Sequence, residues 1–351
     1  MDAQTGNMED EFNAMAPSTV EVVMGEVKKR LGSALSIACA VDGSQMSDRA
    51  MAVGLSLFNN RRGDKFTVIH ISDATKTYLS KHLLPPHLKN YYIDMAHGAR
   101  VTAEWLCREK EEGRSTCECL TRLADKRGVE LLIMGSWGRK GEKLDVLGTV
   151  SDFSLRQSHC SICIVRSTGS SIGGMAGGSG GGAGVPAGIV SARPAKYLFA
   201  TDGSHAAHLA FCFLVTYLYR PTDSIYVVMV TSSDGTEEAK TVDMYKDYMS
   251  KHKINGAGYV KCIDRMTMTV PEGIVEAVTQ YGCDVLVVGI SGYGRKKLGS
   301  VSTDISNRAS CTTIIVKDSR EIVRNRYTAA GSLSLATEMQ VTPKTPQEDV
   351  I

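Results

Sequence analysis

The sequence predicts an α/β protein built from two tandem domains, each a doubly wound parallel sheet of five strands. Three observations predict this class. The 351 residues suffice for two domains of about 150 residues each. A glycine-rich segment divides the chain near its middle. Within each half, strand-length apolar runs alternate with helical patterns, which is typical of a parallel sheet with helices on both faces.

In the first half, helices occupy the gaps between five predicted strands, which lie at about 34–41, 65–71, 100–108, 129–134 and 161–166. The helix after the third strand has the clearest ends. It starts at Ser115-Thr116-Cys117-Glu118, which has the S-x-x-E form of a capping box. It should run to about Arg127 and stop at Gly128.

The second half repeats this scheme. Its predicted strands lie near 196–200, 224–230, 258–265, 284–288 and 312–317. Its predicted helices lie around 205–219, 236–251, 271–281 and 301–309. We therefore expect the same five-stranded domain twice.

The glycine-rich segment sets the domain boundaries. Between Gly169 and Gly188 it holds ten glycines in twenty residues, a composition typical of a flexible linker. The predicted parts are an N-terminal tail, a first domain, the linker, a second domain and a polar C-terminal tail, at 1–33, 34–168, 169–190, 191–319 and 320–351.

Composition excludes several classes of partner. The chain is 43% apolar and 22% charged, and its net charge of +2 lacks the basic excess that binds a phosphate backbone, so nucleic acid is not an expected partner. The longest apolar runs are strand-length, far below the roughly 18 residues of a membrane helix. The N-terminal residues carry Glu9, Asp10 and Glu11 and form no apolar signal segment. We expect a cytoplasmic protein without membrane association.

Neither cysteines nor histidines predict a metal site. The ten cysteines are scattered through strand and helix patterns, and Cys160-x-x-Cys163 has no second pair to complete a zinc site. His205 and His208 stand three residues apart on a predicted helix, with no carboxylate or cysteine nearby to complete a ligand set. Reduced, buried cysteines and ordinary surface or core histidines are the expected interpretation.

The two halves share the order of their motifs at an offset of about 155 residues, which indicates an internal duplication. Three pairs of segments correspond: Ala40–Ser44 with Ala200–Ser204, Met134–Gly138 with Val288–Gly292, and Gly148–Ser151 with Gly299–Ser302.

Each predicted first strand ends in an aspartate, Asp42 or Asp202, at the edge where a doubly wound sheet binds its ligand. A carboxylate there can accept hydrogen bonds from a ribose hydroxyl or an exocyclic amine. The alternative is a turn or capping role, since Ser44 and Ser204 are of the type that caps the helix that follows.

A glycine-rich loop follows each predicted fourth strand and enters a helix. Its glycines permit positive φ and uncover backbone N–H groups, which makes a nest for phosphate oxygens before a helix N-terminus. The alternative is that the glycines only make tight turns, but two such loops in register with a strand-ending aspartate favour a nucleotide site. Basic residues add positive charge to the loops, namely Arg139, Lys140, Lys143, Arg295, Lys296 and Lys297.

These motifs resemble those of the universal stress proteins, whose nucleotide signature after the fourth strand is G-x2-G-x9-G-(S/T). The first half matches it in full, with Gly135, Gly138, nine intervening residues, Gly148 and Thr149. The resemblance spans about 34–167 and 195–318. It implies an adenine nucleotide alpha hydrolase-like fold that binds ATP or a related adenine nucleotide at its strand ends.

The resemblance also implies a set of binding residues in each half. Those of the first half are Val41, Asp42, Met134, Gly135, Gly138, Gly148, Thr149 and Val150. Those of the second half are Asp202, Gly289, Gly292, Gly299, Ser300 and Val301. The second half departs from the signature, because only six residues separate Gly292 from Gly299.

The expected function is ATP binding, with Mg²⁺ on the phosphates, in a stress-response or signalling role with little or no turnover. Enzymes of related architecture use H-x-G-H or S-G-G-x-D-S, and many other nucleotide-binding enzymes use the Walker motif. This sequence has none of these motifs. No catalytic residue is therefore predicted. Two alternatives stay open: a slow ATPase or autophosphorylating enzyme, and an interaction scaffold that needs no nucleotide.

The fifth strands, Ser161–Arg166 and Thr312–Lys317, are apolar and should lie at a sheet edge, where an exposed strand invites pairing. In the universal stress proteins this strand mediates dimerisation, so the resemblance implies that the two halves pair as an intramolecular pseudo-dimer. The alternatives are that a loop or tail covers each edge, or that whole chains form a homodimer through other surfaces.

Overall fold

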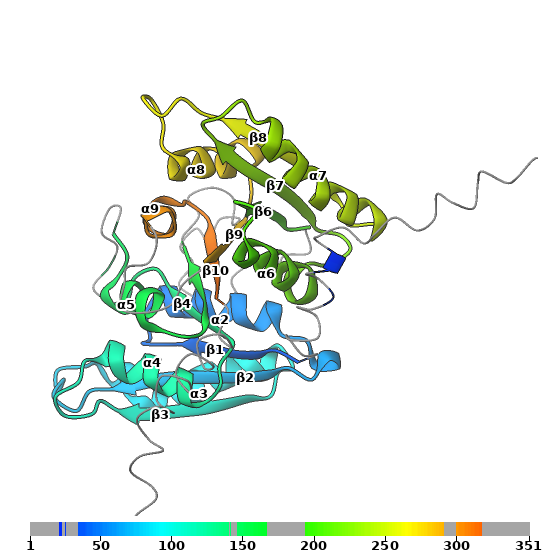
Figure 1. The fold of residues 1–351 in the computed structure, drawn as a ribbon. Helices are drawn as coiled ribbons and strands as arrows, with labels where there is room; N and C mark the ends of the chain where they lie inside the picture. Colours follow the sequence, from blue (N-terminus) through cyan, green and yellow to red (C-terminus); the bar gives the residue numbers. More distant parts are fainter. Residues whose placement is uncertain are drawn as a thin grey trace, which may run out of the picture.

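The computed structural model describes residues 21–22, 25, 34–139, 141, 146–166, 194–290 and 300–317. Within these residues, ten strands form one sheet that runs through both halves of the chain. In the view of Figure 1 the N-terminal half lies below and the C-terminal half above.

The N-terminal half contributes the strands β1 (Ser36–Ala40), β2 (Lys65–Ser72), β3 (Ala103–Glu109), β4 (Leu131–Gly135) and β5 (Ser161–Val165). Its helices are α2 (Gln45–Leu57), α3 (Pro85–Gly98), α4 (Thr116–Lys126) and α5 (Thr149–Gln157), with short 3-10 turns η2 (Asn60–Arg62) and η3 (Lys81–Leu83). The strands lie in the order β3-β2-β1-β4-β5 and pair in parallel.

The C-terminal half contributes β6 (Lys196–Ala200), β7 (Ser224–Thr231), β8 (Gly256–Cys262), β9 (Val285–Ile290) and β10 (Thr312–Lys317). Its helices are α6 (His205–Phe213), α7 (Thr236–Lys251), α8 (Val270–Tyr281) and α9 (Ser300–Arg308), and a π-helical turn, η4 (Leu214–Leu218), continues α6. The order β10-β9-β6-β7-β8 repeats that of the first half. The predicted fold class, two doubly wound α/β units in tandem, is confirmed.

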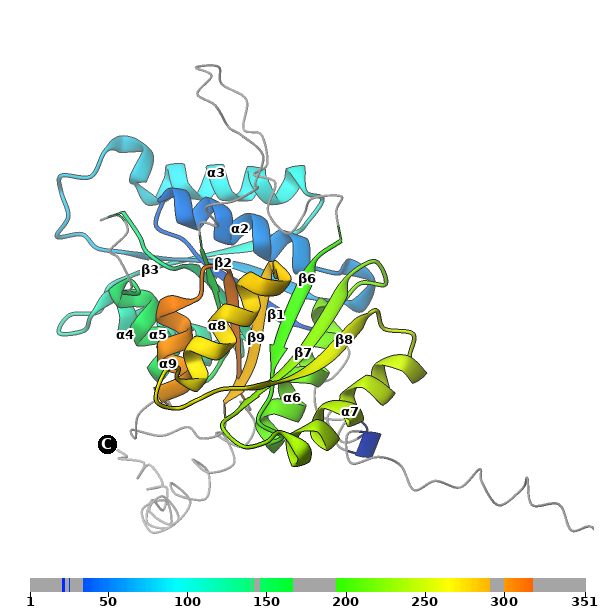
Figure 2. The same cartoon turned by 90° about the horizontal axis from the view of Figure 1, so that it is seen from above.

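Helices cover both faces of the sheet. Side chains alternate along a strand, so Ile133 of β4 joins a core with α2, α3, α6 and α7, while Leu132 joins a core with α4, α5, α8 and α9. Figure 2 shows α4, α5, α9 and α8 following one another along their face. Burial on both faces explains why central strands such as β4 and β5 are almost continuously apolar. Within the described residues, no helix is long and apolar enough to cross a membrane.

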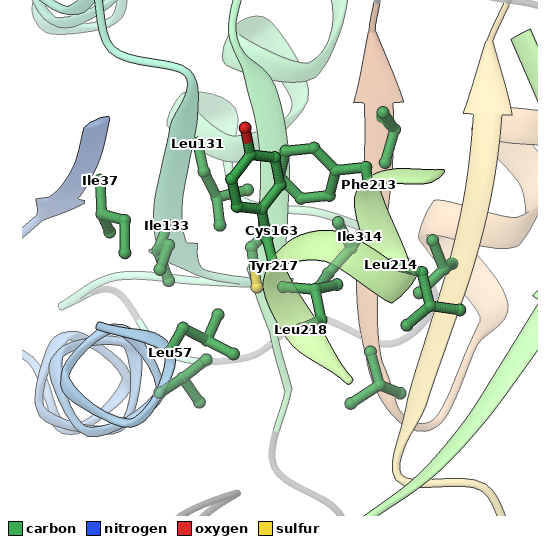
Figure 3. Close-up of a cluster of buried hydrophobic side chains, with 14 of the residues drawn as sticks. Ile37, Leu57, Leu131, Ile133, Cys163, Phe213, Leu214, Tyr217, Leu218 and Ile314 are labelled. Atoms are coloured by element: carbon green, nitrogen blue, oxygen red, sulfur yellow. The ribbon is translucent and has the colours of Figure 1, made fainter. Parts of the chain in front are cut away.

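The two halves are joined by β5 and β10, which pair antiparallel with Cys163 opposite Ile314. On one face of this seam, Leu57 of α2 and Tyr217 and Leu218 of η4 gather over the strands (Figure 3). The pairing of the two fifth strands within one chain, which the resemblance implies, is therefore present in the fold.

Arg62 adds polar contacts between the halves. Its Nη1 donates to the carbonyl oxygens of Thr216 at 3.4 Å and Tyr217 at 3.2 Å, and its guanidinium carbon lies 5.0 Å from the centroid of the Tyr217 ring. The same guanidinium is held by Asp64 through hydrogen bonds of 2.8 and 2.6 Å. A donor from the first half thus satisfies carbonyls in the π-helical turn of the second.

Local signals account for both ends of α4. The capping box at Ser115 is confirmed, because its hydroxyl accepts from the Glu118 amide and the Glu118 carboxylate accepts from the Ser115 amide. Gly128 follows the helix with a φ of 64°, as expected of a helix-ending glycine.

Three elements differ from the sequence-based expectation by three residues or more at one end. The strand expected over 100–108 spans Ala103–Glu109. The helix expected over 205–219 changes to π-helical hydrogen bonding after Phe213, and the chain is extended at Tyr219. The strand expected over 258–265 instead spans Gly256–Cys262, because the carboxylate and carbonyl of Asp264 accept from the following amides and form a turn.

We predict that Ile314→Ala destabilises both halves together. Ile314 is 1% exposed at the seam, and truncating such a side chain removes about 2–5 kcal/mol of the free energy of unfolding. Urea denaturation followed by circular dichroism would measure this loss as a single shifted transition. Met266→Ala is the matched control, because Met266 is 91% exposed and its truncation should change stability by less than about 0.5 kcal/mol. If Ile314→Ala lowers the free energy of unfolding no more than the control does, Ile314 does not stabilise the pairing of β5 with β10.

Candidate nucleotide site

The carboxyl ends of β1 and β4 mark the topological switch point of the first half. β1 pairs with β2 on one side and with β4 on the other, so the connections leave these two strands in opposite directions. Doubly wound sheets bind ligands at this point. Asp42 follows β1 there, and Gly135 ends β4.

The start of α2 holds Asp42. Its Oδ1 accepts hydrogen bonds from the Ser44 amide at 3.0 Å and from the Ser47 hydroxyl at 2.8 Å, while the Asp42 amide donates to Ser47 Oγ at 3.0 Å. Ser44 itself caps α2 by accepting from the Ser47 amide. Burial raises the pKa of the Asp42 carboxyl, but these hydrogen bonds outweigh burial and hold that pKa below its ordinary value. Asp42 is therefore an oriented carboxylate at neutral pH.

The loop after β4 folds back against Asp42. The Arg139 amide donates to Asp42 Oδ2 at 3.3 Å, and Arg139 Nε lies 3.7 Å from the same oxygen. A Cβ added to Gly138 would lie 2.6 Å from that oxygen, so with any larger residue the loop or the Asp42 carboxylate would have to shift. The structure thus brings Asp42, Gly138 and Arg139 together, although they are far apart in the sequence.

The two ends of this loop are tied together. The Gly148 amide donates to the Ser136 carbonyl at 2.7 Å, and the Ser151 hydroxyl donates to the Gly135 carbonyl at 2.7 Å. A Cβ on Gly135 would lie 2.5 Å from Cβ of Met46, which explains the glycine at the end of β4. Gly135 therefore shapes the site through packing.

Helix α5 begins directly after the loop, with Gly148 in the N-cap position and no side chain to cap it. The sequence predicts that Gly148 contributes its amide to phosphate, but that amide is bonded to the Ser136 carbonyl. The first amides of the helix, those of Thr149 and Val150, precede its first backbone bond, from the Asp152 amide to the Gly148 carbonyl. These two amides are the groups that suit an anion.

The side chains of Val41 and Met134 are buried in the core, so only the backbone of these two residues can face a ligand at the strand ends. A third residue here, His70 near the end of β2, was not predicted from the sequence. Its Nδ1 lies 2.8 Å from the Val41 carbonyl oxygen, and its ring stacks on Trp105. Burial lowers the pKa of His70 and favours the neutral ring. The local signal was a histidine within the apolar run from Val68 to Ile71.

The corresponding site of the second half is less constrained. Asp202 Oδ1 accepts from the Ser204 amide at 3.0 Å, but Ala207 stands where the first half has Ser47, so the hydroxyl donor is lost. Gly289 keeps its packing role, because a Cβ there would lie 2.1 Å from the carbonyl oxygen of Ala206. The glycine packing and the serine amide contact are thus repeated, whereas the hydroxyl donor is not.

Several predicted residues cannot be placed. Lys140, Lys143, Gly292, Arg295, Lys296, Lys297 and Gly299 lie outside the described residues, as do the linker and most of both tails. Ser300 is the first residue of α9, and Val301, which follows it, is partly exposed.

Among the described residues, no group of three or more histidine, cysteine or acidic side chains could hold a metal ion. Cys160 and Cys163 are buried, and burial raises the pKa of Cys160 to about 12. His208 is buried against Tyr245, with its Nδ1 2.7 Å from the tyrosine hydroxyl. These contacts agree with the structural interpretation of both motifs.

Both halves match the model of the universal stress protein family, over residues 35–166 and 195–317. The chain belongs to this family. No match was found among curated proteins.

Two solved structures that cover most of this chain share its fold. A universal stress protein from Archaeoglobus fulgidus aligns with a TM-score of 0.56 and 15% identity, covering 80% of this chain and 98% of that one. A functionally unknown protein from Pseudomonas aeruginosa PAO1 aligns with a TM-score of 0.54 and 11% identity, covering 84% and 97%. An Arabidopsis thaliana universal stress protein family member, solved with AMP bound, has a TM-score of 0.29 and 20% identity, covering 35% and 92%.

We predict that Ser47→Ala raises the pKa of Asp42 toward its ordinary value of 3.8. One hydrogen bond to the ionised carboxylate is lost, which should also cost about 1 kcal/mol of stability at pH 7. A lowered carboxyl pKa stabilises the fold above the unfolded-state pKa, and this contribution disappears as the pH falls through the folded-state pKa. The destabilisation should therefore shrink below pH 3.8.

A carbon-13 NMR titration of the Asp42 carboxyl would measure the shift. Ser56→Ala is the control, because the Ser56 hydroxyl donates to the Val53 carbonyl at 2.6 Å within α2. An unchanged Asp42 pKa in Ser47→Ala would show that Ser47 does not set it.

Proposed function

We propose that the N-terminal half binds an adenine nucleotide, ATP with Mg²⁺ on its phosphates, and that this cytoplasmic chain serves a stress-response or signalling role with little or no turnover. The observation that carries the proposal is the bare backbone of Gly138 beside Asp42, where a Cβ would lie 2.6 Å from the carboxylate oxygen. A polar acceptor at one end and an uncapped helix N-terminus at the other suit a ligand with a sugar and phosphates. Family membership supports the same ligand class.

Three groups of the chain would share the binding. Asp42, oriented by α2, would accept a hydrogen bond from a ribose hydroxyl or a base amine. The amides of Thr149 and Val150 would donate to phosphate oxygens at the positive end of the α5 dipole. Arg139, ion-paired to Asp42, would add positive charge beside them. Mg²⁺ prefers oxygen ligands and often keeps several waters, so it would be held mainly by phosphate oxygens.

The titratable groups at these strand ends favour binding over hydrolysis. A general base must reach the reacting water and take its proton. Asp42 already accepts three hydrogen bonds and has a lowered pKa, which makes it a weak base. His70 is buried and has its Nδ1 directed at the Val41 carbonyl. A slow ATPase would need another group.

The second half is proposed to bind nucleotide more weakly. Asp202 is exposed and lacks the hydroxyl donor that Ser47 provides to Asp42. Its glycine loop is also three residues shorter than the family signature, since six residues separate Gly292 from Gly299. We therefore expect one strong site for each chain.

We predict that Gly138→Ala weakens ATP binding by at least about tenfold, a loss of roughly 1.4 kcal/mol. The new Cβ would force the loop away from Asp42 and displace the groups before α5. Isothermal titration calorimetry with MgATP would measure the change. Gly98→Ala is the matched control, because a Cβ at this last residue of α3 meets nothing within 4 Å.

Three outcomes separate the candidate functions. If wild-type protein shows no ATP binding up to about 1 mM, its binding free energy is weaker than about −4.1 kcal/mol. Only the scaffold role would then remain. Sustained release of phosphate that Asp42→Asn abolishes would establish an ATPase instead. Tight binding without turnover, lost in Gly138→Ala and kept in Gly98→Ala, is the result that we expect.

A further inference from the structure

Lys317, the last residue of β10, reaches from the second half into the first. Its ammonium group donates to the carbonyl oxygens of Leu155 at 2.7 Å and Ser158 at 2.8 Å, at the C-terminal end of α5. The residue is only 6% exposed. Helix ends leave carbonyls without intrahelical partners, and a cation there also interacts favourably with the helix dipole. Lys317 is thus a C-terminal cap supplied by the other half.

The contact is reciprocal. Arg166, which follows β5 as Lys317 ends β10, donates through Nη2 to the carbonyl oxygens of Ser306 and Asn307, the second at 2.9 Å. Both carbonyls lie near the C-terminal end of α9, the counterpart of α5. Each half therefore caps the equivalent helix of the other, with a basic residue at the equivalent position.

The capped helix is the one whose other end forms the phosphate site. α5 has nine residues and is about 14 Å long, so Lys317 lies one short helix behind the amides of Thr149 and Val150. A helix of this length is too short to be stable alone, and its position is set by contacts at its ends and along its buried face. The cap thus helps to fix where the phosphate-binding amides point.

We propose that Lys317 is a positioning residue for the nucleotide site of the N-terminal half, so that this site depends on the docked C-terminal half. The inference rests on the proposed function, because it assigns phosphate to the start of α5. It assigns the second half a role at the first site that does not depend on nucleotide binding by the second half.

The charge on this cap responds to pH. Burial lowers the pKa of Lys317 to about 8, while electrostatic interaction with Cys160 and with Asp125 of α4 opposes this shift. Burial raises the pKa of the Cys160 thiol to about 12, so it stays neutral over this range. Asp125 also accepts from His159, whose Nδ1 lies 2.7 Å from its Oδ2. As the pH rises through 8, Lys317 loses its proton, and the attraction that it exerts on phosphate is lost.

We predict that Lys317→Met weakens MgATP binding at pH 7 about sevenfold, as expected for one charge acting over about 14 Å at an effective dielectric constant of about 20. Lys317→Arg keeps a charged donor and should bind within twofold of wild type. Arg166→Met removes the matched cap from α9 and should leave the first site unchanged. Calorimetric titrations would measure all four proteins, with circular dichroism to confirm that each is folded.

A pH series separates positioning by a charged cap from simple packing. Wild-type affinity should fall severalfold between pH 7 and pH 9, with a midpoint near the Lys317 pKa of about 8. Lys317→Arg should not show this fall. Hydrogen exchange without nucleotide gives a second readout: exchange should become faster in α5 for Lys317→Met and in α9 for Arg166→Met.

Failure of the inference differs from failure of the proposed function. The inference is overturned if Lys317→Met binds MgATP as tightly as wild type, or if Arg166→Met weakens binding equally, while the proposed function stands. If wild type itself binds no nucleotide, the proposed function fails. The exchange rates of α5 then decide alone whether Lys317 positions the helix.

Discussion

The antiparallel pairing of β5 with β10 is the constraint on which the rest of the structure depends. It converts two five-stranded sheets into one and buries both faces of the seam beneath helices. Its register also decides which side chains meet, because a slip of one residue would turn every seam side chain to the opposite face. The contacts of Arg62, Arg166 and Lys317 with the other half all follow from this one alignment.

The duplication has preserved backbone geometry more closely than polar chemistry. In both halves the glycine that follows the fourth strand's apolar run packs against the start of the first helix, on Met46 in one and Ala206 in the other. The aspartates differ, because Ser47 holds Asp42 while Ala207 provides no such donor to Asp202. Packing requires the glycine wherever strand and helix approach closely, but the serine is needed only where the carboxylate must be oriented.

Much of the fold could be predicted from the sequence, because its signals are local. Apolar runs located the strands, and the capping box at Ser115 located a helix start. The π-helical turn after Phe213 was not predicted, since its carbonyls accept hydrogen bonds from Arg62, which is distant in the sequence. At the site, Asp42 and Gly138 were predicted separately, but their contact beyond the ends of the neighbouring strands β1 and β4 was not. His70 and Lys317 were not identified either, because a polar residue in a strand does not indicate its partner.

Fusing two paired domains into one chain changes the thermodynamics of their association. In a dimer of separate subunits, the fraction assembled depends on protein concentration, whereas here both partners are always present in equal amount. The seam also occupies both fifth strands, which leaves β3 and β8 as the outer strands of the sheet. The chain therefore cannot exchange halves with related proteins through this edge without first breaking its own pairing. Because such exchange is prevented, each half stays paired with the half with which it has diverged.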